Sequence, residues 1–258
     1  MKKTIALFLI TGLFSCDKTE EFTVDCLPPN LQSGVIAFYP FNGGALADES
    51  PNNNNNLSNP TTATPAADRN GNAGCAYQFD NTTGNDEFLT TANTNFLNGR
   101  NTFSLSLWYR PEGARDDGSF EVLFARGDQG RCPDRRGEWS VGLYDCRRAV
   151  FGHNNSVWAD AVTGLSNGCE GEMAALTGQW HHVVAVRNGD EYRIYFNGNL
   201  DEVDSGNASC SNLHIAQDLG DVFVGTDFTG RIDDIIVYNR ALSAQDVAAL
   251  FELGGCCQ

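Results

Sequence analysis

From Val35 onward the chain consists mainly of short runs in which apolar and polar residues alternate, separated by Gly, Asn and Asp. The clearest run covers residues 101–110 and is stopped by Pro111. Because successive side chains of a strand point to opposite faces, this run predicts a β-strand with one apolar face. That face would carry Phe103, Leu105, Leu107 and Tyr109. The pattern favours an antiparallel all-β protein.

Further runs continue this pattern toward the C-terminus. They predict strands over residues 180–187, 191–197 and 221–225. The dipeptides Asn188-Gly189 and Asn197-Gly198 accept the positive φ of tight hairpin turns. The strands are therefore expected to follow one another as a meander.

One segment, residues 243–253, predicts a helix. Ser243 can cap it, Asp246 lies three residues further on, and Gly254-Gly255 ends it. Strands and helices do not alternate along the chain, which makes an α/β fold unlikely on sequence grounds.

The N-terminus carries an export signal. Lys2 and Lys3 make the first three residues basic, and the apolar run of residues 5–14 follows. The segment ends with Leu13-Phe14-Ser15-Cys16, as an export signal does. This tetrapeptide resembles the lipobox of bacterial lipoproteins, which implies a signal peptide over residues 1–15 and an acylated Cys16. The alternative is an ordinary signal peptide with a chance cysteine. Residues 16–33 are polar, contain Pro28-Pro29, and predict a tether.

The expected location follows from this signal. Two or more acyl chains anchor a protein stably, so the lipid would be its attachment to the membrane. Residues 17–21 resemble the short acidic signal with which some Gram-negative bacteria send lipoproteins to the cell surface. We therefore expect a lipid-anchored protein of the outer membrane that is exposed at the surface.

Charge excludes one class of partner. The chain has 33 acidic and 17 basic residues, a net charge of −16. Such a surface repels a phosphate backbone, so a nucleic-acid partner is disfavoured.

Eight cysteines remain besides Cys16, an even number without a C-x-x-C spacing. In an exported protein they predict up to four disulfides, and sequence alone leaves 105 connectivities open. Our preferred arrangement pairs Cys132 with Cys146 and Cys169 with Cys210. Adjacent cysteines should have different partners, so Cys26 would pair with Cys256 or Cys257 and leave Cys75 for the remaining thiol.

Four segments together resemble the laminin-G-like, concanavalin A-like jelly-roll domain of secreted bacterial proteins. They are residues 101–109, 178–183, 192–198 and 230–243. The resemblance implies an all-β fold, a two-sheet antiparallel jelly-roll sandwich with one short C-terminal helix. It places this domain at residues 34–253 and leaves residues 254–258 as a cysteine-containing tail. The fold hosts lectins, adhesins and some enzymes, so it defines no single function.

The same resemblance implies one structural calcium ion near the ends of the domain. Asp48, Asn52 and Asn54 match the family's calcium loop, and Asp233 matches an acid of the C-terminal strand. Calcium prefers such carboxylate and amide oxygens. Pro51 and Asn53 replace glycines of the family pattern. The alternative is a solvated loop, with Asp233 paired to Arg231 or to a backbone amide.

A basic segment surrounds Cys132 and Cys146 in this acidic chain. Guanidinium groups bind carboxylates or sulfates, and nearby aromatic rings can stack on a sugar or on arginine. Candidate ligand-binding residues are therefore Arg126, Arg131, Arg135, Arg136, Trp139 and Tyr144. The favoured alternative is a hairpin whose arginines, Arg147 and Arg148 included, pair with its own acids.

Signatures of catalysis are weak. The Glu-x-Asp-x-x-Glu strand of related glycoside hydrolases has no match in the sequence. His181 and His182 are neighbours on a predicted strand, so they point to opposite faces and cannot share one metal ion. We therefore expect a domain that binds carbohydrate without catalysis. A structural or adhesive protein-interaction domain is the alternative, and a glycan hydrolase is a weaker one.

Overall fold

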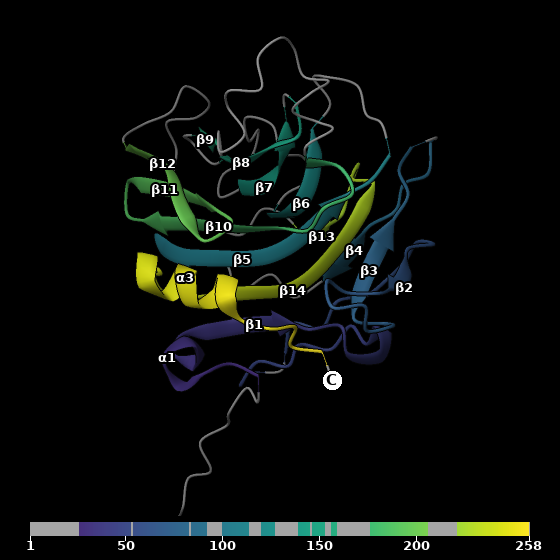
Figure 1. Cartoon of the computed structure of the whole chain (residues 1–258), viewed down its shortest axis with the longest axis horizontal. Coiled ribbons are helices and arrows are strands. Elements are labelled where there is room, and N and C mark those ends of the chain that lie inside the picture. The colour runs from purple at the N-terminus through teal and green to yellow at the C-terminus, as the bar shows by residue number, and fades with distance from the viewer. Residues whose placement is uncertain are drawn as a thin grey trace, which may run out of the picture.

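The computed structural model describes residues 26–52, 54–82, 84–91, 100–113, 120–126, 139–144, 146–152, 156–158, 176–205 and 221–257. These residues form two antiparallel sheets that pack face to face, with a short helix at the C-terminal end (Figure 1). The predicted two-sheet antiparallel sandwich is confirmed.

The larger sheet has eight described strands in the order β12-β11-β10-β5-β14-β3-β2, with β1 paired to β14. Strand β14 lies between β5 on one side and, on the other, β3 for its first residues and β1 for its last. The strands are β1 (Val35–Tyr39), β2 (Thr64–Ala66), β3 (Ala76–Phe79), β5 (Thr102–Pro111), β10 (His181–Asn188), β11 (Glu191–Phe196), β12 (Asn199–Ser205) and β14 (Gly230–Tyr238).

The smaller sheet has six described strands in the order β4-β13-β6-β7-β8-β9. They are β4 (Leu89–Thr91), β6 (Glu121–Arg126), β7 (Trp139–Tyr144), β8 (Arg148–Gly152), β9 (Ser156–Trp158) and β13 (Val222–Val224). In the view of Figure 1 this sheet lies above the larger one.

The main core lies between the sheets. Phe103, Leu105, Leu107 and Tyr109 of β5 are all buried there, as the alternation predicted. Strands β10 and β11 follow each other through the turn at Gly189, whose φ is +66°. The first two strands of the predicted meander therefore lie side by side in the larger sheet, whereas the third, predicted over residues 221–225, is β13 of the smaller sheet and pairs with β4 and β6.

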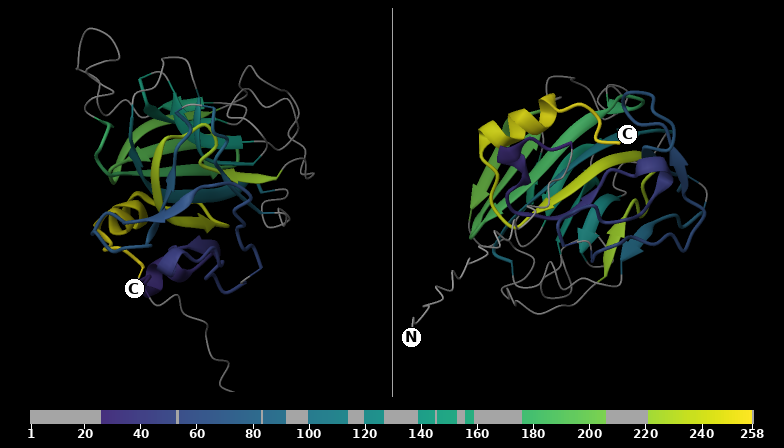
Figure 2. Two further views of the ribbon diagram at one scale, coloured as in Figure 1. Left: turned by 90° about the vertical axis from the view of Figure 1, so that its right-hand side faces the viewer. Right: turned by 90° about the horizontal axis from the view of Figure 1, so that it is seen from below.

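A second core covers the outer face of the larger sheet. Helix α3 (Ala244–Glu252) lies along this face with Val247 and Leu250 buried, and the short helix α1 (Pro29–Gln32) lies beside it with Leu31 buried (Figures 1 and 2). A 3₁₀ turn, η1 (Asn42–Gly44), follows β1.

The folded domain extends beyond the boundaries expected from sequence. Leu27 and Leu31, in the predicted tether, are 2% and 0% exposed and belong to the second core. At the other end the C-terminal tail returns to the N-terminal segment, where Cys256 bonds to Cys26 (Figure 2). The polar composition and the Pro28-Pro29 pair suggested a tether. Instead, apolar side chains packed in the second core hold residues 26–33 on the domain.

Within the described residues, every helix is too short or too polar to cross a bilayer. The predicted signal peptide and Cys16 lie outside those residues.

Candidate functional site

The smaller sheet presents aromatic side chains on its outer face. In β7, Val141 and Leu143 are fully buried between the sheets. Because side chains alternate along a strand, Gly142 and Tyr144 point to the opposite face. Tyr144 is partly exposed there.

Phe120 forms a stacked pair with Tyr144, which we call the aromatic pair. Glu121 of β6 pairs with Leu143 of β7, so Phe120, one residue earlier, continues this register opposite Tyr144. The two ring centroids are 6.3 Å apart with an interplanar angle of 29°. A Cβ at Gly142 would come within 2.4 Å of the Phe120 ring. The glycine therefore lets this ring lie close against the sheet.

Both residues of the aromatic pair are partly exposed, so part of this aromatic surface meets solvent. An aromatic ring combines a large apolar surface with an electron-rich face, and the Tyr144 hydroxyl adds a polar group. Such a surface suits the C–H face of a sugar ring or an apolar side chain of another protein.

Arg147, on the turn between β7 and β8, has a structural role. Its Nε donates to Glu121 Oε1 at 2.9 Å, and both groups are buried. Its Nη1 donates to Gly113 O and Thr177 Oγ1, at 2.9 and 3.2 Å, and its Nη2 donates to Glu112 O at 3.0 Å. This guanidinium is fully occupied by its own chain, and its acid partner is Glu121 of β6. The acids of the basic segment itself lie outside the described residues.

Two other candidates of the basic segment are buried. Trp139 is 5% exposed, and its ring lies 4.7 Å from Phe103 and 5.7 Å from Phe124, centroid to centroid. Its indole is therefore a core group, which corrects the prediction that it offers a surface for stacking on sugar. Arg126 is 3% exposed. Among the predicted ligand-binding residues that are described, Tyr144 is the partly exposed one. Arg131, Arg135 and Arg136 lie outside the described residues.

Asp48, the first predicted calcium ligand, forms hydrogen bonds with the backbone of its own loop. Its Oδ1 accepts from the amides of Phe38 and Ser50, each at 3.0 Å. Its Oδ2 accepts from the amide of Asn55 at 3.2 Å and from Asn55 Nδ2 at 2.9 Å. Each oxygen already has two N–H donors, so neither has a lone pair left for a metal ion.

The other predicted calcium ligands lie in different surroundings. Asn52 and Asn54 are exposed, and Asp233 forms an ion pair with Arg69. In the described part of the chain, no three side chains of the His, Cys, Asp or Glu type are arranged to hold a metal ion. The predicted ligand set therefore does not fit a calcium ion in this geometry.

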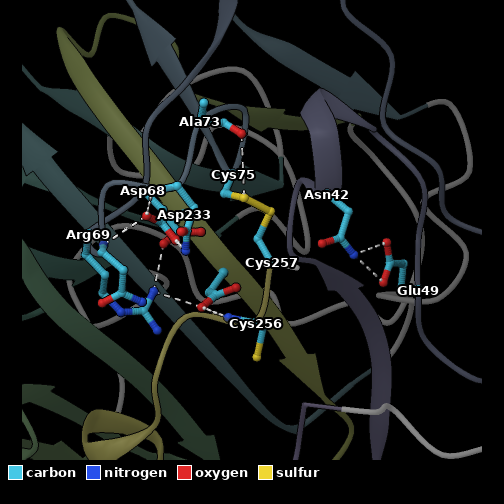
Figure 3. Close-up of a disulfide and its surroundings, with 12 residues drawn as sticks. Asn42, Glu49, Asp68, Arg69, Ala73, Cys75, Asp233, Cys256 and Cys257 are labelled. Atoms are coloured by element: carbon cyan, nitrogen blue, oxygen red, sulfur yellow. Dashed lines mark hydrogen bonds and ion pairs between the residues drawn. A yellow bond between two sulfur atoms is a disulfide. The ribbon is translucent and has the colours of Figure 1, made fainter.

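Asp233 lies instead in a buried charge cluster beneath the C-terminal tail (Figure 3). Arg69 Nη1 lies 2.7 Å from Asp233 Oδ2 and 2.8 Å from Asp234 Oδ2. The guanidinium carbon lies 4.5 Å from the ring centroid of Trp108. Asp234 Oδ2 also accepts a hydrogen bond from the amide of Cys256 at 3.1 Å. The cluster thus joins the β2–β3 connection, β14 and the tail.

Both carboxyls of this cluster have perturbed pKa values. Burial, reinforced by the charge of Asp234, raises the pKa of Asp233 well above its ordinary value, against the opposing effect of Arg69. Burial also raises the pKa of Asp234. Two adjacent buried carboxyls that share one guanidinium cannot both ionise without a large cost.

Two disulfides hold the tail beside this cluster. Cys26 is bonded to Cys256, and Cys75 to Cys257 (Figure 3). The adjacent cysteines thus have different partners, as predicted, and Cys75 takes the remaining thiol. Cys146 is also disulfide-bonded. Its predicted partner Cys132 and the predicted pair Cys169 and Cys210 lie outside the described residues.

His181 and His182 point to opposite faces of the larger sheet, as predicted. The ring of His181 lies 5.6 Å from that of Tyr109 in the main core, and the ring of His182 lies 4.9 Å from that of Trp108 on the outer face. His182 Nε2 is 2.9 Å from Ser106 Oγ, but both residues are buried. Burial and then the charge of Arg69 lower the pKa of His182 to about 3, so this histidine is neutral. The two histidines are packing residues.

Phe120 and Arg69 were not identified from the sequence. A glycine inside a strand, such as Gly142, often marks the close approach of another group, and this was the available signal for Phe120. Arg69 lies in a turn of small polar residues, about 160 positions before Asp233. No spacing rule connects two such positions, so only the fold brings them together.

The geometry defines a two-sheet jelly-roll domain with an aromatic surface on one sheet and a sealed charge cluster on the other. The sequence of residues 82–248 matches the concanavalin A-like lectin/glucanases superfamily, and the chain belongs to that family. Among curated proteins, none matches the sequence.

Solved structures with this fold include several binding domains. Domain 4 of AbnA, a GH43 extracellular arabinanase from Geobacillus stearothermophilus, was solved with arabinotriose. It has a TM-score of 0.57 and 16% identity over 84% of this chain and 97% of that one. Two botulinum neurotoxin structures are similar too. One is of type C, whose cell entry depends on two ganglioside molecules (TM-score 0.60, 13% identity, 86% of this chain). The other is the type DC binding domain with rat synaptotagmin II (TM-score 0.59, 14% identity, 86% of this chain).

The chain spans about half the length of the toxin chains, 52% in each case. At these identities the similarity establishes the fold.

Proposed function

We propose that this protein is a non-catalytic lipoprotein of the bacterial surface whose concanavalin A-like domain binds carbohydrate through the aromatic pair, Phe120 and Tyr144. The carrying observation is that two stacked side chains remain partly exposed on the outer face of the smaller sheet, beside a glycine that makes room for the Phe120 ring.

Two further observations support this proposal. The arabinanase domain that was solved with arabinotriose has nearly the same extent as this chain. The adjacent acids of β14, Asp233 and Asp234, are buried against Arg69 and are closed to a substrate. A carbohydrate-binding role needs no acid–base pair, whereas retaining glycoside hydrolysis needs two carboxyls about 5 to 5.5 Å apart that can reach the glycosidic bond.

A glycan array probed with the purified protein tests carbohydrate binding. We expect Tyr144→Ala to weaken binding of the best glycan by about 10- to 30-fold, the usual effect of truncating a central aromatic contact. Tyr144→Phe keeps the ring and should retain most of the affinity. Phe223→Ala is the matched control, because Phe223 is another partly exposed ring of the smaller sheet and pairs with Phe88 instead. An array without any hit, or equal losses for Tyr144→Ala and Phe223→Ala, would contradict the proposed site.

The membrane anchor is proposed separately, from the lipobox-like tetrapeptide that ends at Cys16. Acylation at Cys16 would hold the domain at the outer membrane through the short segment before Cys26. We expect the wild-type protein to partition with membranes and Cys16→Ser to be released in soluble form. A Cys16→Ser protein that stays fully with the membrane fraction would contradict the anchor.

Adhesive protein binding is a second candidate, favoured by strand β12. Leu200 and Val203 of this strand are 49% and 47% exposed, and both pair with residues of β11 that point to the same face. A toxin domain of the same fold binds a protein, rat synaptotagmin II. If this role is correct, a Leu200→Ser/Val203→Ser variant should lose binding to host or bacterial surface proteins while its glycan-array signal stays unchanged.

A further inference from the structure

The guanidinium of Arg69 is surrounded by oxygen atoms from two segments of the chain. Its Nη1 contacts one carboxylate oxygen each of Asp233 and Asp234, at 2.7 and 2.8 Å. Its Nη2 donates to the carbonyl oxygens of Leu253 and Gly254, at 3.3 and 3.0 Å. Two carboxylates and two backbone carbonyls are the kinds of ligand that calcium takes in proteins.

The arrangement around Arg69 is fixed from several sides. Asp68, its neighbour, accepts hydrogen bonds from the amides of Asn70 and Asn72, at 2.9 and 2.7 Å, and so holds the turn that carries Arg69. The Arg69 side chain is 9% exposed. The Cys75–Cys257 disulfide ties the same connection to the tail. The arginine therefore reaches the two acids in a preorganised position.

One guanidinium leaves some oxygens of the cluster without a partner. The second oxygen of each acid, Asp233 Oδ1 and Asp234 Oδ1, is buried and accepts no hydrogen bond within the described residues. A buried carboxylate oxygen without a partner is costly, and a divalent cation would contact such oxygens directly. The pocket thus offers more lone pairs than Arg69 uses.

We propose that Arg69 is a built-in cation that closes the domain in place of a calcium ion, and that it masks a latent divalent-cation site formed by Asp233, Asp234 and the carbonyls of Leu253 and Gly254. The arginine joins β14 to the C-terminal tail. With Arg69 present, the positive charge and bulk of the guanidinium keep a metal ion out. Without it, these oxygens lose the cation that they share.

Thermal unfolding with calcium and with a chelator tests this proposal. The wild-type midpoint should be the same in both conditions. Arg69→Ala should unfold at a lower temperature in chelator and recover at least about 5 °C when millimolar calcium is added, since a ligand that binds only the folded state stabilises it by mass action. Arg231→Ala is the matched control. Arg231 lies on β14 and contacts Gln78 and Glu112 rather than the buried acids, so its loss should create no response to calcium.

Terbium, a luminescent substitute for calcium, gives a second readout that does not depend on the midpoint. An ion in the place of the guanidinium would lie within about 5 Å of the Trp108 ring, so indole excitation should sensitise its emission in Arg69→Ala but not in the wild type. Adding Asp233→Asn to Arg69→Ala should abolish both the emission and the response to calcium. A wild type stabilised by calcium overturns the proposal. So does an Arg69→Ala protein that gains nothing from calcium, whether or not it folds in chelator.

Discussion

At the scale of single residues, Asp233 makes the stability of the domain depend on pH. Its carboxyl is buried beside Asp234, Arg69 and Asp68, and burial raises its pKa well above the ordinary value. In the unfolded chain the pKa of the same carboxyl is about 3.9. Between that pH and the higher pKa of the folded state, only the folded state keeps the proton. The resulting contribution to stability is complete below the unfolded pKa and is lost as pH rises through the folded pKa.

We therefore predict that the free energy of unfolding of the wild type falls as pH rises through the folded pKa of Asp233. Asp233→Asn mimics the protonated acid at every pH, so its unfolding free energy should vary less with pH over that range. Denaturant unfolding at a series of pH values measures both slopes. Asp190→Asn, at an exposed turn, is the control and should keep the wild-type slope. Identical slopes for wild type and Asp233→Asn would show that the carboxyl does not hold its proton.

Gly255 offers a second residue-level test, because it lets the tail approach the turn at Asp68. A Cβ at Gly255 would lie 2.6 Å from Asn70 Nδ2 and 3.0 Å from Asp68 Oδ2, whereas a Cβ at Gly254 meets nothing within 4 Å. Gly255→Ala should therefore lower the unfolding free energy by about 1 kcal/mol, the low end of the cost of overpacking, because the exposed Asn70 side chain can move aside while Asp68 is buried. Gly254→Ala should leave it nearly unchanged. Equal effects of the two substitutions in chemical denaturation would argue against this close contact.

At the scale of secondary-structure elements, helix α3 was the most completely predicted part of the fold. It begins after Ser243, whose side chain accepts from the amide of Asp246 while Asp246 bonds back to the amide of Ser243. Gly254 follows one residue after the C-cap, Leu253. Capping depends on residues three positions apart, and such local signals are readable without tertiary structure.

The cap of α3 should carry measurable stability. Ser243→Ala removes the acceptor for the Asp246 amide, so we expect a loss of about 1 kcal/mol and a drop of about 2 to 4 °C in the melting midpoint. Gln245→Ala changes an exposed residue of the same turn without touching the cap and is expected to have no destabilising effect. A loss of the same size in both variants would mean that the cap contributes nothing specific.

The strands were predicted unequally for a physical reason. In β5 and β10 the runs of apolar residues are long and regular, so the sequence predicted the boundaries of these strands to within one residue. Strands β2, β4 and β9 have three residues each, too few for an alternation to stand out. These three segments form strands because neighbouring strands of the sheet pair with them, and not because of an alternation in their own sequence.

At the scale of the whole molecule, the two described disulfides close long loops over nearly the full domain. Their partners are separated by 230 and 182 residues. Cys256 and Cys257 are adjacent. Once either disulfide has formed, the loop that the second one closes therefore contains only the chain between Cys26 and Cys75. The second bond to form therefore restricts the unfolded chain less than the first.

This geometry predicts that the two disulfides are not additive. In the chain-entropy model, Cys26→Ala/Cys256→Ala and Cys75→Ala/Cys257→Ala should each cost about 4 kcal/mol. Removal of all four cysteines should cost more than the sum of the two, because the last bond closes the longer loop. Denaturant unfolding of the three variants under non-reducing conditions gives the comparison. If the quadruple variant loses less unfolding free energy than the sum of the two double variants, the two disulfides do not share the loop between Cys26 and Cys75 in this way.

The sequence by itself determined the antiparallel all-β class, the inward face of β5, the capped C-terminal helix and the separation of His181 from His182, because period-two alternation and helix capping are local properties. The arrangement of the strands as a two-sheet sandwich was implied by the family resemblance. The sequence also indicated that Cys256 and Cys257 need different partners. Only the tertiary structure decided that Trp139 belongs to the core, that Phe120 stacks on Tyr144, and that Asp233 binds Arg69 instead of joining Asp48. Those contacts join residues far apart in the chain, and the packing of the two sheets, not a spacing in the sequence, sets which of them meet.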